Sequence, residues 1–265
     1  MVILITGVSS GFGLATAGRL ASDGHTVYGT VRRDVDQLSG VNYLKADVRD
    51  DDSVISAVRE LVSREGRIDV LINNAGMGIG GPAEFNSMED IELQMDTNFL
   101  GQVRFTRAVL PYMRRQKSGR IIYFSSIGGL MGLPFQSYYS ASKFAIEGFC
   151  EALRMEVGGY GIKVIVIEPG DFATGFTSSR RKGAVNDEAA AAYPALYSSV
   201  ASFENDERTG MKPEHLADRM SRIVTCPHPR YSYVISTFEQ KLSIFLKAVL
   251  PKPMFASILK SYYKL

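Results

Sequence analysis

Cysteine and histidine are scarce in this sequence of 265 residues. The two cysteines, Cys150 and Cys226, cannot form a disulfide framework, which fits a reducing compartment, so we expect a cytoplasmic protein. The three histidines, His25, His215 and His228, lie far apart, and with two scattered cysteines they form none of the spacings typical of metal ligands. We therefore expect no metal site.

Excess charge and long hydrophobic runs are also lacking. The 30 basic and 28 acidic residues give a net charge of +2, which does not predict a strongly basic, nucleic-acid-binding surface. No run of about 18 uncharged apolar residues is present, so we expect no membrane-spanning helix. The first apolar run, Val2–Ile5, begins at once and ends in Thr6-Gly7, which predicts a buried strand rather than a signal peptide.

Short apolar runs alternate with helix-length amphipathic segments over the first 170 residues. This alternation predicts an α/β protein with a doubly wound parallel sheet, a Rossmann fold, and the length suits a single domain over residues 1–265. The expected strands are Val2–Ile5, Thr26–Val31, Val41–Leu44, Val70–Ile72, Arg120–Phe124, Lys163–Ile167 and a late strand at Tyr231–Ile235. The expected helices are Leu14–Asp23, Ser53–Arg64, Ile91–Arg115, Tyr139–Gly158 and Pro213–Val224.

Two segments fall outside this alternation. Residues 175–212 predict a helical insertion that covers the substrate as a mobile lid. Residues 236–265 form a C-terminal extension with five lysines, one glutamate and two apolar stripes. This extension could close the substrate pocket or form a subunit interface, and its basic flanks also allow peripheral contact with an anionic membrane.

A glycine-rich turn, Thr6–Gly13, follows the first strand and precedes a helix. Glycines let a ligand approach the backbone closely, and the helix N-terminus favours a pyrophosphate. A tight turn without a ligand is the structural alternative. The same residues match G-x-S-x-G, the nucleophile elbow of serine hydrolases, which requires an acid and a histidine. His25 lies in the next strand region and His215 in an expected surface helix, so the hydrolase hypothesis is disfavoured.

Tyr139 and Lys143 are four residues apart in an expected helix and therefore share a face. An ammonium near a phenol favours the phenolate, so we expect Lys143 to lower the pKa of Tyr139 toward neutrality. A tyrosine so tuned can donate a proton to a carbonyl oxygen or accept one from an alcohol. Tyr138 is a poorer candidate, because the residue four positions on is Ser142.

Three motifs, Thr6–Gly13, Asn73–Gly76 and Tyr139–Lys143, together resemble the short-chain dehydrogenase/reductase family. Asp69, Pro169-Gly170 and Thr174 add to the resemblance, which covers about residues 1–225. The family relation implies a catalytic serine about a dozen residues before the tyrosine; Ser126 matches better than Ser125. It also implies that Asn98 helps to hold the lysine through water. The catalytic residues implied by the resemblance are Asn98, Ser126, Tyr139 and Lys143.

The resemblance also implies a nicotinamide cofactor. An acidic residue at the end of the second strand usually selects NAD, but this strand ends in Arg32-Arg33-Asp34, and arginine suits a ribose phosphate. We therefore expect NADP(H), with NAD possible through Asp34 if the register shifts. Asp47 matches an adenine-edge contact, or it caps the helix that starts near Asp52. The implied cofactor residues are Thr6, Gly7, Ser9, Ser10, Gly11, Phe12, Gly13, Arg32, Arg33, Asp47, Val48, Asn74, Ala75, Gly76, Tyr139, Lys143, Pro169, Gly170 and Thr174.

Segments Gly128–Pro134 and Ser142–Gly148 resemble the hydroxysteroid and retinol dehydrogenase branch of that family. This resemblance implies that the chain interconverts a ketone and a secondary alcohol on a lipophilic substrate: a steroid, a retinoid or a long-chain keto lipid. The family also implies a homodimer or homotetramer formed through the helices Ile91–Arg115 and Tyr139–Gly158. A non-catalytic nucleotide sensor of the same fold is the alternative, disfavoured because all four catalytic residues are present.

Overall fold

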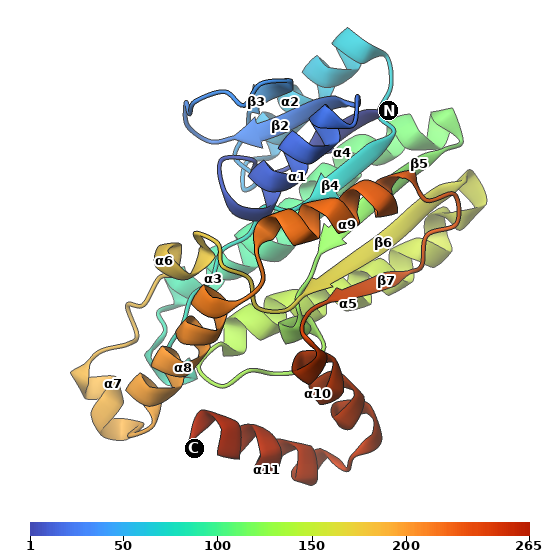
Figure 1. Ribbon diagram of the computed structural model, residues 1–265. Helices are drawn as coiled ribbons and strands as arrows, with labels where there is room; N and C mark the ends of the chain where they lie inside the picture. Colours follow the sequence, from blue (N-terminus) through green and yellow to red (C-terminus); the bar gives the residue numbers. More distant parts are fainter.

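A seven-stranded parallel sheet forms the centre of the protein, shown by a computed structural model that describes all 265 residues (Figure 1). The strand order is β3-β2-β1-β4-β5-β6-β7, and every neighbouring pair is parallel. This arrangement confirms the predicted doubly wound fold. The strands are β1 (Val2–Ile5), β2 (Thr26–Val31), β3 (Val41–Lys45), β4 (Val70–Asn73), β5 (Gly119–Phe124), β6 (Ile162–Pro169) and β7 (Ser232–Ile235).

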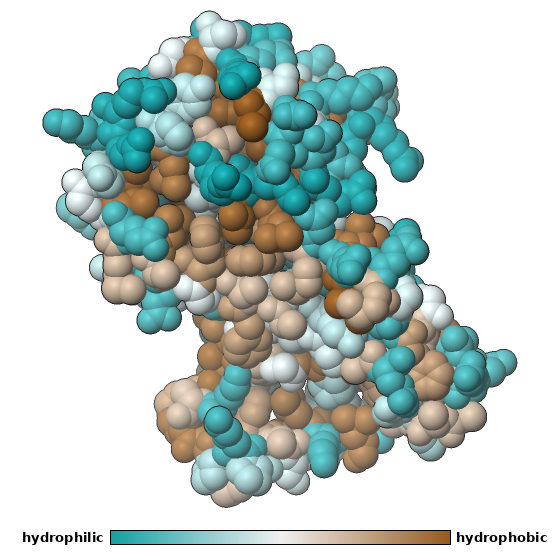
Figure 2. All heavy atoms as spheres, turned by 180° about the vertical axis from the view of Figure 1, so that it is seen from behind, coloured by the Kyte–Doolittle hydropathy of each residue, from teal (hydrophilic) through white to brown (hydrophobic).

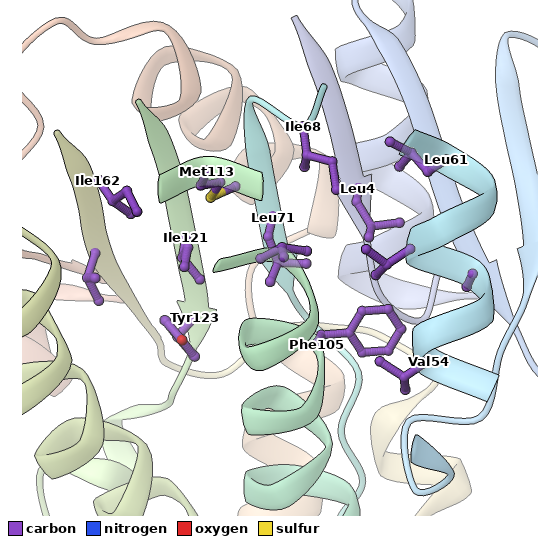
Figure 3. Close-up of a cluster of buried hydrophobic side chains, with 14 of the residues drawn as sticks. Leu4, Val54, Leu61, Ile68, Leu71, Phe105, Met113, Ile121, Tyr123 and Ile162 are labelled. Carbon is purple, nitrogen blue, oxygen red and sulfur yellow. The ribbon is translucent and has the colours of Figure 1, made fainter. Parts of the chain in front are cut away.

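Helices cover both faces of the sheet because the strands are apolar on both sides. Leu4 packs into a core under α2, α4 and α5, whereas its neighbours Ile3 and Ile5 pack into a second core under α1 and α9. Figure 3 shows part of the first core, where Phe105 of α4 and Leu61 of α2 meet the sheet. The covering helices are α1 (Gly11–Ser22), α2 (Asp51–Glu65), α4 (Gly101–Gln116), α5 (Ser137–Val157) and α9 (Pro213–Thr225).

The predicted single helix Ile91–Arg115 is wrong in one respect. The chain forms α3 (Met88–Met95), then a π-helical turn at Asp96–Leu100, and only then α4. A π turn adds a residue to the helical repeat and redirects the side chains within it. Asn98 lies in this turn and is fully buried.

The strand order reverses between β1 and β4, which lie side by side although β2 and β3 separate them in sequence. In open α/β sheets, ligands bind at the carboxyl ends of strands at such a switch point. The glycine turn follows β1, and Asn74 follows β4. The topology therefore brings two of the sequence motifs to the position that favours a ligand.

Two groups of helices extend beyond the carboxyl ends of the strands (Figure 1). Residues 175–212 form α6 (Phe176–Ser179), α7 (Asp187–Ala192) and α8 (Leu196–Thr209), and the C-terminal segment forms α10 (Phe238–Val249) and α11 (Lys252–Tyr263). None of the helices combines the length and apolarity needed to cross a bilayer. Short 3-10 helices complete the structure at Ala83–Phe85, Ile127–Gly129 and Gly158–Tyr160.

Candidate active site

A cleft of about 840 Å³ lies across the carboxyl ends of the strands. One end is formed by the glycine turn and the ends of β2, β3 and β4, and the other by α8, α10 and α11. Besides Tyr139 and Lys143, fourteen of the cofactor residues implied by the family resemblance line it. They are Gly7, Ser9, Ser10, Gly11, Phe12, Arg32, Asp47, Val48, Asn74, Ala75, Gly76, Pro169, Gly170 and Thr174.

The glycine turn needs its glycines for geometric reasons. Gly7 has a φ of +72°, a conformation that L side chains rarely adopt. A Cβ on Gly13 would lie 2.1 Å from the carbonyl oxygen of Gly7, so only glycine lets α1 start this close to the turn. Ser10 is the N-cap of α1, but its side chain makes no capping hydrogen bond. The first amides of α1 are therefore available to a phosphate.

Thr6 and Asn74 fasten the glycine turn to the loop after β4. The Thr6 hydroxyl accepts hydrogen bonds from the backbone N–H groups of Asn74 and Ala75, both at 3.0 Å. Asn74 Nδ2 donates to the carbonyl oxygens of Thr6 and Gly7 at 2.9 and 3.0 Å. Thr6 and Gly13 do not line the cleft themselves. They shape the glycine turn from outside the cleft, Thr6 through its hydrogen bonds and Gly13 through the close approach of α1.

The residues after β2 and β3 form the far end of this half of the cleft. Arg32 lines it, whereas Arg33 and Asp34 do not. Asp34 is exposed and lies 3.5 Å from Lys45 outside the cleft. Asp47 also lines the cleft. Its carboxylate binds the Arg49 guanidinium at 2.7 Å, which holds its pKa below the ordinary value.

The helix-capping alternative for Asp47 is wrong. The N-cap of α2 is Asp50, whose side chain accepts from the N–H groups of Asp52 and Ser53. Asp47 precedes the cap and uses its carboxylate on Arg49 instead. It therefore remains part of the cleft wall.

These residues fit a dinucleotide. The uncapped start of α1 suits a pyrophosphate, and the turn around Gly7 leaves no side chain between the backbone and a ligand. Arg32 and Asp47 lie at one end of the lining, and Pro169, Gly170 and Thr174 lie toward Tyr139. An extended ligand with a charged middle can thus span the distance from β2 to α5.

Tyr139 and Lys143 both line the cleft from α5. Burial raises the pKa of Tyr139 to about 12, and hydrogen bonding with the Ser126 side chain opposes that rise. Burial also lowers the pKa of Lys143 to about 8. The Lys143 ammonium donates to the carbonyl oxygen of Phe124 at 2.8 Å and lies 5.7 Å from the centre of the Tyr139 ring.

The prediction that Lys143 brings the pKa of Tyr139 toward neutrality is therefore wrong for this structure. Desolvation of the phenolate outweighs every favourable interaction with it. Tyr139 is protonated at neutral pH, which suits it to donate a proton. The shared helix face was predicted from the i,i+4 spacing, but the depth of burial was not.

Ser126 and Ser125 have different surroundings at the end of β5. Ser126 Oγ accepts from the N–H of Gly128 at 3.0 Å, and a Cβ built on Gly128 would touch both this oxygen and the Tyr139 ring. Ser125 is 3% exposed, and its hydroxyl faces the carbonyl oxygen of Lys143 at 3.5 Å. Ser126 is therefore the serine beside the Tyr139 ring.

Asn98 lies behind the cleft wall rather than in it. Its Oδ1 accepts from the N–H of Met77 at 2.8 Å, and its Nδ2 donates to the Met77 carbonyl oxygen at 2.9 Å and to Ser142 Oγ at 3.1 Å. It thereby ties the π turn to the loop after β4 and to α5. No direct hydrogen bond joins it to Lys143, which is compatible with contact through a water molecule.

A charged wall near Tyr139 was missed by sequence reasoning. The side chain of Arg180 is 1% exposed, lies between the rings of Phe176 and Phe203, and binds both carboxylate oxygens of Glu207. The Phe176 ring lies 5.8 Å from that of Tyr139. The surrounding run Ser178–Gly183 is typical of an exposed loop, so composition gave no signal for the burial of one arginine within it.

Asp171 and Gln240 extend this wall toward α10. Gln240 Nε2 donates to Asp171 Oδ2 at 2.5 Å. Burial, together with repulsion from Glu207 and Asp206, raises the pKa of Asp171 to about 7. Asp206 in turn accepts from the Tyr262 hydroxyl at 2.5 Å. The part of the cleft lined by Asp171, Asp206 and Gln240 is therefore polar.

The geometry rules out His25 as the histidine that a serine-hydrolase site at Ser9 requires. Ser9 follows the carboxyl end of β1, whereas His25 precedes β2, which runs parallel to β1 with Val2 opposite Thr26. The two residues therefore lie at opposite edges of the sheet, about four strand residues or about 13 Å apart. His25 cannot activate Ser9.

Comparisons with known proteins agree with the geometry. Residues 1–184 match the protein family described as short chain dehydrogenase. A 3-ketodihydrosphingosine reductase from Bacteroides thetaiotaomicron is 44% identical over 99% of this chain and 97% of its own length. The estradiol 17-beta-dehydrogenase 1 of Rattus norvegicus is 38% identical over 88% of this chain and 72% of its own. A short-chain dehydrogenase structure from Streptomyces avermitilis covers 99% of this chain and 96% of its own, with a TM-score of 0.83 and 29% identity.

Proposed function

The chain belongs to the short-chain dehydrogenase family, whose members are oxidoreductases acting on CH–OH and C=O groups, and from this premise we propose that it reduces a lipophilic long-chain ketone with NADPH. The observation that carries the proposal is the cleft itself. One end of the cleft suits a dinucleotide, and apolar side chains line the other end. Tyr139 and Ser126 lie between these two ends. These apolar residues include Leu246, Phe255 and Leu259.

In this proposal Tyr139 is the acid that protonates the carbonyl oxygen of the substrate. A pKa of about 12 keeps it protonated at neutral pH, as reduction requires. The Ser126 hydroxyl donates a second hydrogen bond to the same oxygen and so stabilises the negative charge that develops there. A nicotinamide dinucleotide held along the glycine turn and Arg32 would supply the hydride for the carbonyl carbon.

Lys143 and Asn98 act around this centre. Lys143 keeps an ammonium at pH 7, because its pKa of about 8 lies above that pH, and the Phe124 carbonyl oxygen fixes its position. From there it binds the ribose of the cofactor and places positive charge near Tyr139. Asn98 positions Ser142 and the backbone of Met77, and it supports Lys143 through a water molecule.

NADPH is proposed over NADH because of the charge at the end of β2. Arg32 lines the cleft, and its guanidinium is close enough to Asp47 to lower the pKa of that carboxyl group. An arginine here can bind a ribose phosphate, whereas Asp34, the residue that would favour NAD, lies outside the lining. Related folds accommodate either dinucleotide: one similar structure is a serine dehydrogenase with NADP+, 27% identical with a TM-score of 0.77. Another is a complex with NAD, with a TM-score of 0.79.

Among lipophilic ketones, a long-chain keto lipid fits best. The relative that covers 99% of this chain is named for a 3-keto long-chain substrate. Asp171 and Glu207, which line the cleft, suit a polar group near the ketone, and the apolar end suits a chain. Residues 175–212 then act as the lid over this substrate, and the segments Ile91–Arg115 and Tyr139–Gly158 form the interface of a homodimer or homotetramer.

The proposal is tested by following NADPH consumption with three ketones or aldehydes. These are 3-ketodihydrosphingosine, a 17-keto steroid and a retinaldehyde, each also offered with NADH. We expect the highest kcat/KM for the long-chain ketone with NADPH. Equal or higher kcat/KM for the steroid or the retinoid would contradict the substrate class, and a preference for NADH would contradict the cofactor.

A further inference from the structure

The outward face of α10 is apolar. Phe238, Leu242, Phe245 and Val249 are between 43% and 75% exposed. Their spacings of four, three and four residues place them along one face of the helix, within about 60° of its circumference. A surface helix normally turns such a stripe toward the protein, so this one lacks a partner.

The other side of α10 faces the cleft. Gln240, Ser243 and Leu246 line the cleft, and Gln240 donates to Asp171. The helix therefore turns its longest apolar stripe away from the protein, the reverse of an ordinary surface helix. Rotating the helix to bury this stripe would break the contact between Gln240 and Asp171, so the stripe stays exposed.

Exposed apolar side chains also occur on α11 and directly after it. Met254, Ile258, Tyr262 and Leu265 are between 45% and 55% exposed, at spacings of four, four and three residues. Eight of the 18 exposed large apolar side chains of the protein thus lie in its last 28 residues. Scattered apolar side chains are normal on a surface, but such a concentration marks an interaction site. In the lower part of Figure 2, where α10 and α11 lie, brown and tan atoms lie among teal and white ones.

Charge identifies the partner. Residues 236–265 carry five lysines and one glutamate, a net charge of +4, so the other 235 residues carry −2 of the total +2. Lys241, Lys252, Lys260 and Lys264 are exposed around the apolar stripes. A second copy would bring two such clusters of positive charge together, whereas an anionic bilayer neutralises them and accepts the apolar side chains.

The stripe on α11 reaches the mouth of the cleft. Ile258 and Tyr262 are about half exposed and also line the cleft. Tyr262 is held there by its hydrogen bond to Asp206, and Ser199 Oγ donates to the carbonyl oxygen of Tyr263 at 2.6 Å, which ties α11 to α8. A surface docked on these helices would therefore lie directly at the entrance to the cleft.

We propose that α10 and α11 dock on the surface of an anionic lipid bilayer, with the apolar stripes in the acyl boundary and the lysines at the head groups. Hydrophobic ligands then enter the cleft from the bilayer past Ile258 and Tyr262 without crossing water. Docking depends on the surface of the C-terminal helices alone. It therefore stands or falls independently of the proposed reaction.

Vesicle co-sedimentation of the full chain tests the proposal. The vesicles contain phosphatidylcholine alone or mixed with phosphatidylglycerol. We expect binding to the mixed vesicles, weaker binding to the neutral ones and a decline as salt is raised. The double variant Leu242→Glu/Phe245→Glu should bind the mixed vesicles at least about tenfold more weakly. Ile55→Glu, at an apolar side chain of α2 that is 39% exposed, is the matched control and should bind like the unmodified chain.

Three results would overturn the proposal. They are absence of binding to the mixed vesicles, equal binding by the double variant and Ile55→Glu, and equal binding to neutral and anionic vesicles. Analytical ultracentrifugation adds a further criterion: self-association that the double variant abolishes, in a chain that does not bind vesicles, would assign the surface to a second copy. An unchanged thermal unfolding midpoint for each variant shows that the fold is intact.

Discussion

Gln240 of α10 donates a hydrogen bond to Asp171 at 2.5 Å, which joins the C-terminal extension to the loop directly after β6. The Gln240 oxygen also accepts from the Thr237 N–H and closes the capping box of α10. The Gln240 side chain thus sets both where α10 starts and how far α10 lies from Gly170. The C-terminal extension is therefore part of the cleft and not an appended tail.

Gly170→Ala should disrupt this junction. A Cβ on Gly170 would lie 1.9 Å from Gln240 Oε1 and 2.7 Å from Ser236 Cβ, so α10 must shift or Gln240 must give up its hydrogen bonds. We expect a several-fold rise in the KM of the lipophilic substrate and a loss of stability of about 1 to 2 kcal/mol. Gly158→Ala, where a Cβ meets no atom within 4 Å, is the control. Equal effects of the two variants would show that the junction is not rigid.

Lys143→Met should stabilise the protein while it removes activity. Burial lowers the pKa of Lys143 from 10.5 to about 8, so the charged form is disfavoured in the folded protein. Below pH 8 the burial of the charged ammonium lowers the stability of the folded chain by its full amount. This destabilisation disappears as the pH rises from about 8 to 10.5. At pH 7 we expect the free energy of unfolding of the variant to be about 1 to 3 kcal/mol larger than that of the unmodified chain.

Chemical denaturation at pH 7 and pH 10 measures this effect. Gln102 also donates to the Phe124 carbonyl oxygen at 3.4 Å, so the variant does not leave that oxygen unpaired. Lys45→Met, at an exposed side chain of β3, should change the unfolding free energy by less than about 0.5 kcal/mol. A destabilised Lys143→Met variant at pH 7 would contradict the account of the buried ammonium.

Glu168→Gln should become more stabilising as the pH rises. Glu168 is 3% exposed, its Oε2 lacks a hydrogen-bond partner, and burial with the nearby Glu147 raises its pKa to about 7. The unfolded chain ionises near pH 4.5, so the stability contributed by the protonated group is lost as the pH rises from about 4.5 to 7. Glutamine does not ionise and avoids this loss.

We expect the variant and the unmodified chain to be similar in stability near pH 4.5 and to differ by about 2 to 3 kcal/mol at pH 8. Urea unfolding across this range measures the difference. Glu151→Gln, on the exposed side of α5, supplies a control without a buried carboxyl group. A difference that stays constant from pH 4.5 to 8 would refute the assignment to Glu168.

Arg32→Ala should reduce the preference for NADPH over NADH, because Arg32 is the arginine of its pair that lines the cleft. Loss of a charge-assisted contact to the ribose phosphate is worth about 1.5 to 3 kcal/mol, so the ratio of kcat/KM values for the two cofactors should fall by about tenfold or more. Arg33→Ala changes the neighbouring exposed arginine and should leave the ratio nearly unchanged. Equal ratios in the two variants would argue against Arg32 as the phosphate contact.

The sheet and the lining of the cleft were largely predictable from the sequence. Buried parallel strands such as Val2–Ile5 are uninterrupted apolar runs, and the residues that follow the parallel strands reach one edge of the sheet. The π turn at Asp96–Leu100 was not predictable, because helical periodicity continues on both sides of it. Nor was the contact between Arg180 and Glu207, which are 27 residues apart and meet only through the packing of α6 on α8.

Two features that govern the chemistry depend on burial and not on spacing. The spacing of Tyr139 and Lys143 predicts a shared face, but only the packed structure shows that desolvation raises the pKa of the tyrosine and lowers that of the lysine. Similarly, the apolar residues of α10 predict an amphipathic helix, but not that its stripe faces outward while Gln240 turns inward.

The most direct test of the proposed reaction compares two neighbouring tyrosines of α5. Tyr139 lines the cleft, whereas the Tyr138 hydroxyl donates to the Ala83 carbonyl oxygen outside it. NADPH oxidation with the long-chain 3-ketone should fall by at least about 100-fold in Tyr139→Phe and by less than about threefold in Tyr138→Phe. Full turnover by Tyr139→Phe, with its fold intact, would contradict the assignment of this tyrosine as the acid.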